Sequence, residues 1–281
     1  DVSANVGIGV SVATGSSIAQ NNDVDVRQAY LSFGNDGMGT VKLGRDYGLF
    51  GFHSIISDMT LIGVGAATNA TQNGRVSLGH IGSGSTLPGM YGQAVYTTPN
   101  MGGFSVDLGL MSPTNNLATA KKDNLQFQAR ATYAGQGFKA WVGAKTQKYD
   151  GVGGFTMNAG EVGGSVSAGA FGLLANYQGG KGIGILADGD QGGVKGNNLL
   201  LQGTMQAAQN VKLGLGYGRS KNDSAFTGSD LRSNENLTAG VYYNLTKSVT
   251  LVGEIGQTRS KGFSGASAKQ NSVAIGGILF F

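Results

Sequence analysis

The residues best suited to bind a charged ligand are arginines inside strand-like segments. Arg27 and Arg45 fall in the stretch 26–52, which otherwise consists largely of Gly, Leu, Tyr and Phe. Arg130 lies in the stretch 125–133, where polar and apolar residues alternate. A guanidinium group stays charged and pairs well with carboxylates and phosphates. These strands therefore need one face in water, and anionic ligands would meet the arginines on that face.

Catalytic and metal chemistry have no support in the sequence. The chain has no Cys and only 2 His. His53 and His80 both stand in one long loop, without the spacing of a metal site or a catalytic triad. Glycine pairs such as Gly163-Gly164 are not phosphate loops, because no helix follows them. The sequence predicts no enzyme, no cofactor and no metal site.

The segments that carry these residues read as β-strands. With 13% charged residues and 51 Gly among 281 residues, the chain has about half the charge of a soluble domain. No apolar run approaches the roughly 20 residues of a transmembrane helix. In the stretch 125–133, Leu, Phe, Ala and Tyr alternate with Gln, Arg and Thr, which is the period of a strand between two solvents. We count about fourteen segments of this kind.

The connections between these segments indicate how the strands are arranged. Turns of a few residues, such as Asn35-Asp36-Gly37, alternate with loops of roughly eight residues or more. An antiparallel barrel in an outer membrane has short periplasmic turns and long extracellular loops, which places both ends of this chain on the periplasmic side. A solenoid would show one repeat period, and a soluble sandwich would need more large apolar side chains. We predict an all-β fold, a single transmembrane antiparallel β-barrel domain over residues 1–281.

Two motifs and the last residue resemble a known family. The family's paired strand motif is matched by VRQAYLSFGNDGMGTVKLGRDYG (26–48), its next hairpin by YTTPNMGGFSVDLGL (96–110), and the C-terminal signature of outer-membrane barrels by Phe281. Over nearly its whole length the chain looks like a general porin of the Gram-negative outer membrane, of the β-proteobacterial type. The resemblance implies a homotrimer in outer-membrane lipid and a water-filled channel for ions and small hydrophilic solutes. It also implies that residues 52–87 fold inward as a constriction loop.

The strand count departs from the family pattern. Family members usually have about sixteen strands, and the motif at Arg27 falls near the fourth of them. Here about one strand and its loop precede that motif. Either the chain is a variant with about fourteen strands, or two N-terminal strands are missing. Both counts are even, so the barrel can close without leaving unpaired backbone groups in lipid.

The resemblance assigns roles to several charged residues. Arg27 and Arg45 match arginines that project toward the constriction, and Arg130 lies on the polar face of its own strand. In the family, acidic residues on the inward loop face this basic wall. Here the loop offers only Asp58, with Arg75 as its basic residue, so the field should be lopsided toward positive. Because a charge facing lipid costs about 2–4 kcal/mol at the bilayer midplane, we expect further charges in the lumen at Lys42, Lys145, Glu161, Lys212 and Glu254.

Some roles stay open at this point. Arg45 shares its strand parity with Leu43, which a bulge or a rim position could explain, and Lys42 and Lys212 can be ordinary solvated residues. A passive diffusion channel with a weak anion preference fits this wall. A channel selective for dicarboxylates or phosphate, and a plugged structural barrel in an envelope complex, are the alternatives. A net charge of +4 is too slight to argue for nucleic acid.

Overall fold

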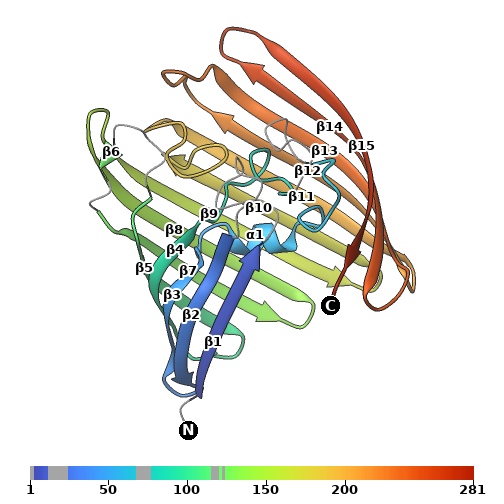
Figure 1. Ribbon diagram of the computed structural model, residues 1–281, viewed down its shortest axis with the longest axis horizontal. Coiled ribbons are helices and arrows are strands. Elements are labelled where there is room, and N and C mark those ends of the chain that lie inside the picture. The colour runs from blue at the N-terminus through green and yellow to red at the C-terminus, as the bar shows by residue number, and fades with distance from the viewer. Residues whose placement is uncertain (1–2, 12–24, 68–76, 115–119, 122–123) are drawn as a thin grey trace.

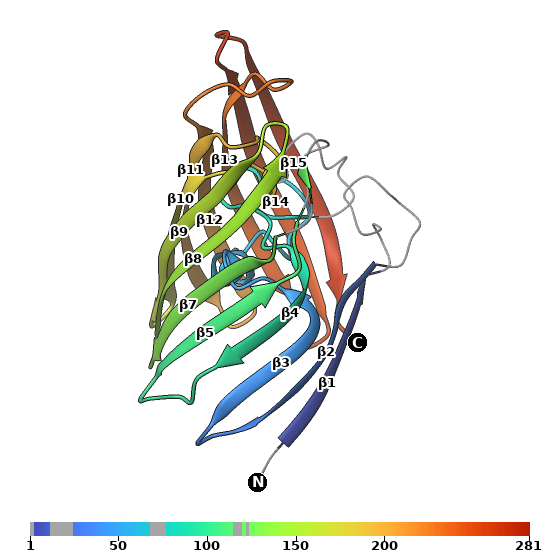
Figure 2. The same ribbon diagram turned by 90° about the vertical axis from the view of Figure 1, so that its left-hand side faces the viewer.

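The computed structural model describes residues 3–11, 25–67, 77–114, 120–121 and 124–281. They form one strongly curved antiparallel sheet that encloses a single short helix (Figures 1 and 2). The strands follow one another in chain order, except that the short β6 pairs with β8. The helix is α1 (Phe52–Ser57), and the strands are β1 (Ser3–Ser11), β2 (Asp25–Asn35), β3 (Gly39–Tyr47), β4 (Met90–Thr97), β5 (Phe104–Met111), β6 (Ala120–Lys121), β7 (Gln126–Gly135), β8 (Phe138–Gly151), β9 (Phe155–Ala168), β10 (Phe171–Lys181), β11 (Lys195–Ala208), β12 (Val211–Asn222), β13 (Leu231–Asn244), β14 (Val249–Gly262) and β15 (Ser267–Leu279).

The predicted strand pattern is confirmed. Of the fifteen strands, β6 lies off the main path, which leaves fourteen that pair in sequence. The first and last of these, β1 and β15, form the two edges of the sheet within the described residues. No helix among these residues is long and apolar enough to cross a membrane.

The two faces of the sheet differ in chemistry, as β10 illustrates. Phe171, Leu173 and Tyr177 point outward and are 61%, 61% and 46% exposed. Asn176 and Gln178, which alternate with them, are buried on the inner face. This alternation gives the sheet an apolar outer face and a polar inner face, as expected for a wall between lipid and water.

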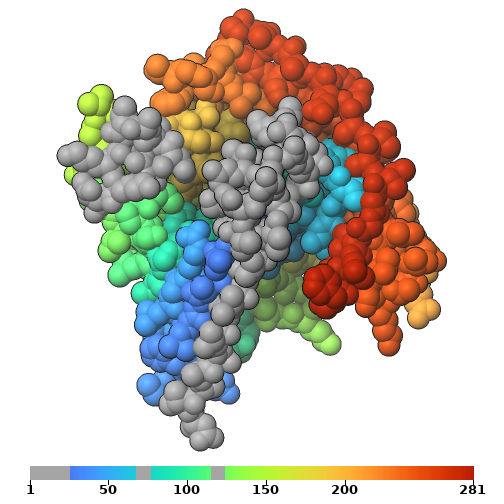
Figure 3. All heavy atoms as spheres, in the orientation of Figure 1, coloured from blue at the N-terminus to red at the C-terminus, as the bar shows by residue number. Residues whose placement is uncertain are grey.

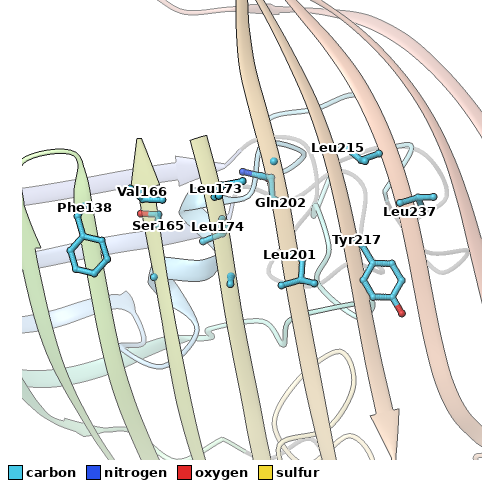
Figure 4. Close-up of a pocket in the computed structure, with 13 residues that line it drawn as sticks. Phe138, Ser165, Val166, Leu173, Leu174, Leu201, Gln202, Leu215, Tyr217 and Leu237 are labelled. Carbon is cyan, nitrogen blue, oxygen red and sulfur yellow. The ribbon is translucent and has the colours of Figure 1, made fainter. Parts of the chain in front are cut away.

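The outer face also carries a shallow apolar groove across β8 to β13. Figure 4 shows Leu173, Leu201, Tyr217 and other apolar side chains on successive strands of this groove. Small residues such as Gly164 and Gly203 lie between them and leave a volume of about 570 Å³. The groove belongs to the lipid-facing side and not to the interior of the barrel.

The predicted alternation of short turns with long loops is found in part of the sheet. The turn after β2 is tight because the Asn35 Oδ1 accepts hydrogen bonds from the N–H groups of Gly37 and Met38, at 3.0 and 2.9 Å. At the opposite rim, the connections 48–89, 182–194 and 223–230 are long. The expected long loops after β8 and β14 are absent there, because these strands continue as extended hairpins with β9 and β15 and end in the turns 152–154 and 263–266.

The connection 48–89 is here called the inner loop, and its described residues, 48–67 and 77–89, lie against the inner face of the sheet. The loop carries α1, which Figure 2 shows inside the curve of the strands. Leu49 packs on Tyr91, Val95 and Met111 of the neighbouring strands β4 and β5. In Figure 3, a cyan part of the loop lies beside the red β15, at the far end of the sheet. The loop therefore crosses most of the interior.

Glycines on β12 make room for this crossing. Gly214, Gly216 and Gly218 alternate along the strand on the face that the inner loop covers. A Cβ atom at Gly216 would lie 2.8 Å from the His80 Cε1 atom, and one at Gly218 would lie 2.0 Å from the Ser83 carbonyl oxygen. Larger residues here would push the loop away, so this part of the wall is shaped for the loop.

Candidate functional site

Two inward-facing acids hold the inner loop by its backbone. The N–H group of Gly51 donates to both carboxylate oxygens of Glu161, at 3.0 and 2.9 Å. Glu254 accepts the N–H groups of Val64 and Ala66 at 3.2 and 3.1 Å. The two glutamates are only 5% and 2% exposed. They therefore face inward, as expected, but they lie beneath the loop and contribute little charge to its open side.

Asp58 stabilises the inner loop internally. Its Oδ2 atom lies 3.0 Å from the His80 Nδ1 atom and accepts the backbone N–H of His80 at 2.7 Å. Thr60 donates to Oδ1 through its hydroxyl at 2.7 Å and through its N–H at 2.9 Å. Burial acts to raise the pKa of Asp58, but the charge and hydrogen bonds of His80, with the bond from Thr60, outweigh burial and lower it. This carboxylate is turned into the loop rather than toward the wall.

Arg130 on β7 lies at the inner face beside the start of the loop. Its Nη2 and Nε atoms donate to Asp107 Oδ2 on β5, at 2.7 and 3.0 Å. The guanidinium carbon lies 5.9 Å from the centre of the Phe52 ring in α1. The Arg130 and Asp107 side chains are 11% and 9% exposed. Arg130 thus joins the loop to the wall, and its charge is compensated by an acid on the next strand of the main path.

The inner face of β3 carries a second compensated cation. Lys42 forms an ion pair with Asp46, which stands on the same face four residues later. Gln28 on β2 donates to Asp46 at 2.8 Å, and the Lys42 ammonium lies 5.3 Å from the centre of the Tyr30 ring. These contacts make Lys42 a residue of the inner wall.

The structure places Arg45 differently from the expectation drawn from the family resemblance. It stands opposite Ala29 and Gly92, and it shares its face with the lipid-facing Leu43. Its Nε atom donates to the carbonyl oxygen of Val26 at 2.9 Å. The regular alternation of β3 is the reason, because it assigns the inner face to the residues on either side of Arg45.

Two other arginines, Arg27 and Arg75, were predicted to lie at the constriction. Arg27 is half-buried and lies in β2 where the register with β1 shifts, between Val10 and Gly9 of that strand. Arg75 falls outside the described residues.

Lys145 is covered by a second loop. The connection 182–194 folds inward, and its Asp188 forms a buried ion pair with Lys145. Asp188 also accepts a hydrogen bond from the Tyr91 hydroxyl at 3.2 Å, and Leu87 of the inner loop donates to the Leu186 carbonyl at 2.9 Å. The two loops therefore pack together on the inside of the sheet, and Lys145 is not an open lumen charge.

Two further lysines complete the inner wall. Lys212 on β12 is exposed, and Lys139 on β8 lies 3.4 Å from the Nδ1 atom of His53 in α1. Within the described part of the chain, neither lysine has an ion-pair partner. Burial, followed by the charges of Arg130 and Lys139, lowers the pKa of His53 to about 3. Two cations, Arg130 and Lys139, therefore lie beside α1.

The acids that pair with Lys42, Arg130 and Lys145 were not predicted from the sequence. Asp46 could have been found from its spacing, because residues four apart in a strand share a face. Asp107 carries the same kind of signal as Arg130, a charge in the middle of an apolar strand. Asp188 offers no such signal, since its position depends on how its loop folds. No three His, Cys, Asp or Glu residues gather into a metal-binding group in the part of the chain described.

Comparison with protein families gives a direct result. The model of the Gram-negative porin family matches residues 2–262. The chain belongs to this family. It is therefore an outer-membrane β-barrel of a Gram-negative bacterium that forms a water-filled channel for passive diffusion. No curated protein is similar enough in sequence to count as a match.

Solved porin structures share the fold of this porin at low sequence identity. The outer membrane channel DcaP of Acinetobacter baumannii has a TM-score of 0.79 and 17% identity, over 100% of this chain and 81% of that one. The anion-selective porin from Comamonas acidovorans has a TM-score of 0.66 and 20% identity, over 92% and 79%. The trimer form of OmpT from Vibrio cholerae has a TM-score of 0.54 and 15% identity, over 92% and 80%.

Proposed function

We propose that this porin is a general diffusion channel with a weak preference for anions, and that the inner loop forms its constriction. The observation that carries the proposal is the balance of charge on the open inner surface. Lys42 and Arg130 are each paired with an aspartate, while Glu161 and Glu254 are buried beneath the inner loop. Of the inner-face cations described above, Lys139 and Lys212 are those that form no ion pair within the described residues.

These two lysines give the open surface a positive surplus. Both stand on the inner face, and no acid within the described residues forms an ion pair with either of them. Burial is the main cause of the low pKa of His53, and the charges of Arg130 and Lys139 beside α1 lower it further. A pore lined by one sign of charge concentrates ions of the opposite sign. The similar fold of the anion-selective Comamonas porin supports the same direction.

The proposal is tested by the reversal potential across a planar bilayer in a KCl gradient. We expect the wild-type channel to favour chloride weakly, and the double variant K139Q/K212Q to shift the reversal potential toward that of potassium. The variant R45Q is a matched control, since it removes a positive charge from the outer face. An unchanged reversal potential in K139Q/K212Q, or an equal shift in R45Q, would contradict the assignment.

The same recordings bear on the alternative functions. A small conductance that is blocked by one dicarboxylate or by phosphate would favour a selective channel. Absence of current from folded protein would favour a plugged barrel. The inward folding of both the inner loop and the connection 182–194 is compatible with this alternative. We further propose a homotrimer in outer-membrane lipid, in line with the trimer form of OmpT. Closure in three equal steps would support this assembly, and closure in a single step would oppose it.

A further inference from the structure

A cavity of about 410 Å³ lies between the inner loop and the wall, on the side of the short turns. Two cross-strand rows build the wall side of this cavity. Gln206, Lys212 and Tyr242 stand in register on β11, β12 and β13. Asn244, Thr250 and Ile278 form the second row, on β13, β14 and β15. The volume is within the range of small-molecule sites.

The loop side of the cavity is apolar. Ile56 and Ile62 line it and are 50% and 58% exposed, although they face the interior of a channel. Ile278 and Phe280 line the wall side near them. Exposed apolar side chains scattered singly are ordinary, but a contiguous apolar patch marks a binding surface. Here three exposed apolar residues, Ile56, Ile62 and Phe280, line one cavity together with the partly buried Ile278.

The polar side of the cavity offers one positive charge. Lys212 is exposed, and within the described residues it forms no ion pair. Asn244 lies in the neighbouring row, where its Oδ1 atom already accepts a hydrogen bond from Thr250 at 2.8 Å. Asp58 also lines the cavity, but its carboxylate is occupied by His80 and Thr60. The cavity therefore combines a cation with an apolar surface, and its acid is already bonded elsewhere.

We propose that this cavity binds amphiphilic monocarboxylates, with the carboxylate at Lys212 and the alkyl or aryl part between Ile56, Ile62 and Phe280. The inference rests on the proposed channel function and adds a preferred class of solute to it. A short hydrophilic acid such as acetate would use only the charge. A longer acid such as hexanoate would also bury methylene groups, and two of them increase binding by about tenfold.

Because the cavity is lined by residues next to the short turns 209–210 and 245–248, the effect should depend on the side of addition. Hexanoate added on the periplasmic side should reduce the chloride current at about tenfold lower concentration than acetate. Addition on the extracellular side should be less effective, since the inner loop then lies between the solute and the cavity.

The test measures block of the chloride current by hexanoate, acetate and hexanol in planar bilayers, for the wild type, I62S and K212Q. Each variant is compared with its own unblocked current. We expect I62S to weaken block by hexanoate but not by acetate, and K212Q to weaken block by both acids. Block by hexanol, which lacks the carboxylate, should be weak throughout. V152S, which changes an exposed apolar residue in the turn after β8, is the matched control.

Two outcomes would overturn the proposal. Equal block by hexanoate and acetate would show that the apolar surface does not bind solute, and unchanged hexanoate block in I62S would remove Ile62 from the site. In both cases the channel would still conduct, so the proposed diffusion function would stand. Absence of any current from folded protein would instead count against the channel function itself.

Discussion

The ion pair between Arg130 and Asp107 allows ion selectivity to be changed in both directions at one place. The two side chains are joined by hydrogen bonds of 2.7 and 3.0 Å, so their charges largely cancel for a passing ion. Substituting Arg130 by Ser leaves the negative charge of Asp107, and substituting Asp107 by Asn leaves the positive charge of Arg130. We expect R130S to favour cations, D107N to favour anions, and R130S/D107N to lie close to the wild type.

The size of the effect follows from Coulomb's law. A unit charge about 5 Å from an ion in water has an energy of about 0.8 kcal/mol, which salt at about 0.1 M reduces to about 0.5 kcal/mol. The charge acts with opposite sign on an anion and on a cation. The anion-to-cation permeability ratio should therefore change by about fivefold in each single variant.

The assay is the reversal potential in a KCl gradient, measured on protein whose folding is verified by its heat-dependent electrophoretic mobility. R45Q serves as control because Arg45 stands on the outer face of β3. Shifts of R130S and D107N in the same direction would refute the reasoning, as would a double variant that lies far from the wild type. Either result would mean that the pair does not act as a compensated charge at the inner surface.

Two further predictions concern how the inner loop is held. Substituting Gly216 by Leu should lower stability by about 1–3 kcal/mol through overpacking against His80, measured by thermal unfolding in detergent, whereas G253A should have little effect because nothing lies within 4 Å of a Cβ atom at Gly253. The pKa of Asp58 is lowered from 3.8 in the folded state, so its stabilising contribution is complete above that value and is lost as the pH falls through the lower folded pKa. The acid-induced drop in melting temperature should therefore be smaller in D58N, and an equal drop in both proteins would show that other groups cause it.

Much of the wall could be predicted from the sequence because strand alternation is a local property. The inward placement of Arg130 followed from the alternation of its neighbours, and the structure agrees with it. The same rule explains Arg45, whose parity with Leu43 already pointed outward. The family resemblance suggested the inward position for Arg45, while the pattern of residues around it indicated the outward one.

The charge balance of the inner face could not be predicted in the same way. Glu161 and Glu254 were predicted as lumen charges, and the structure covers both with the inner loop. Lys145 was also predicted as a lumen charge, and the connection 182–194 brings Asp188 into a buried ion pair with it. All three side chains lie on the inner face of the sheet. Their exposure to the lumen depends on a loop, and the sequence of a loop has no periodic pattern that predicts its path.

The sequence by itself determined that this chain is an outer-membrane barrel, because period-two polarity, low charge and short turns are encoded in neighbouring residues. Only the tertiary structure decided which charges meet the solute. Glu254 and Val64 are 190 residues apart, and Lys145 and Asp188 are 43 apart. Such contacts depend on the curvature and register of the whole sheet and on the packing of two loops inside it. The positive surplus that we propose for the pore therefore depends on the folded wall rather than on the composition.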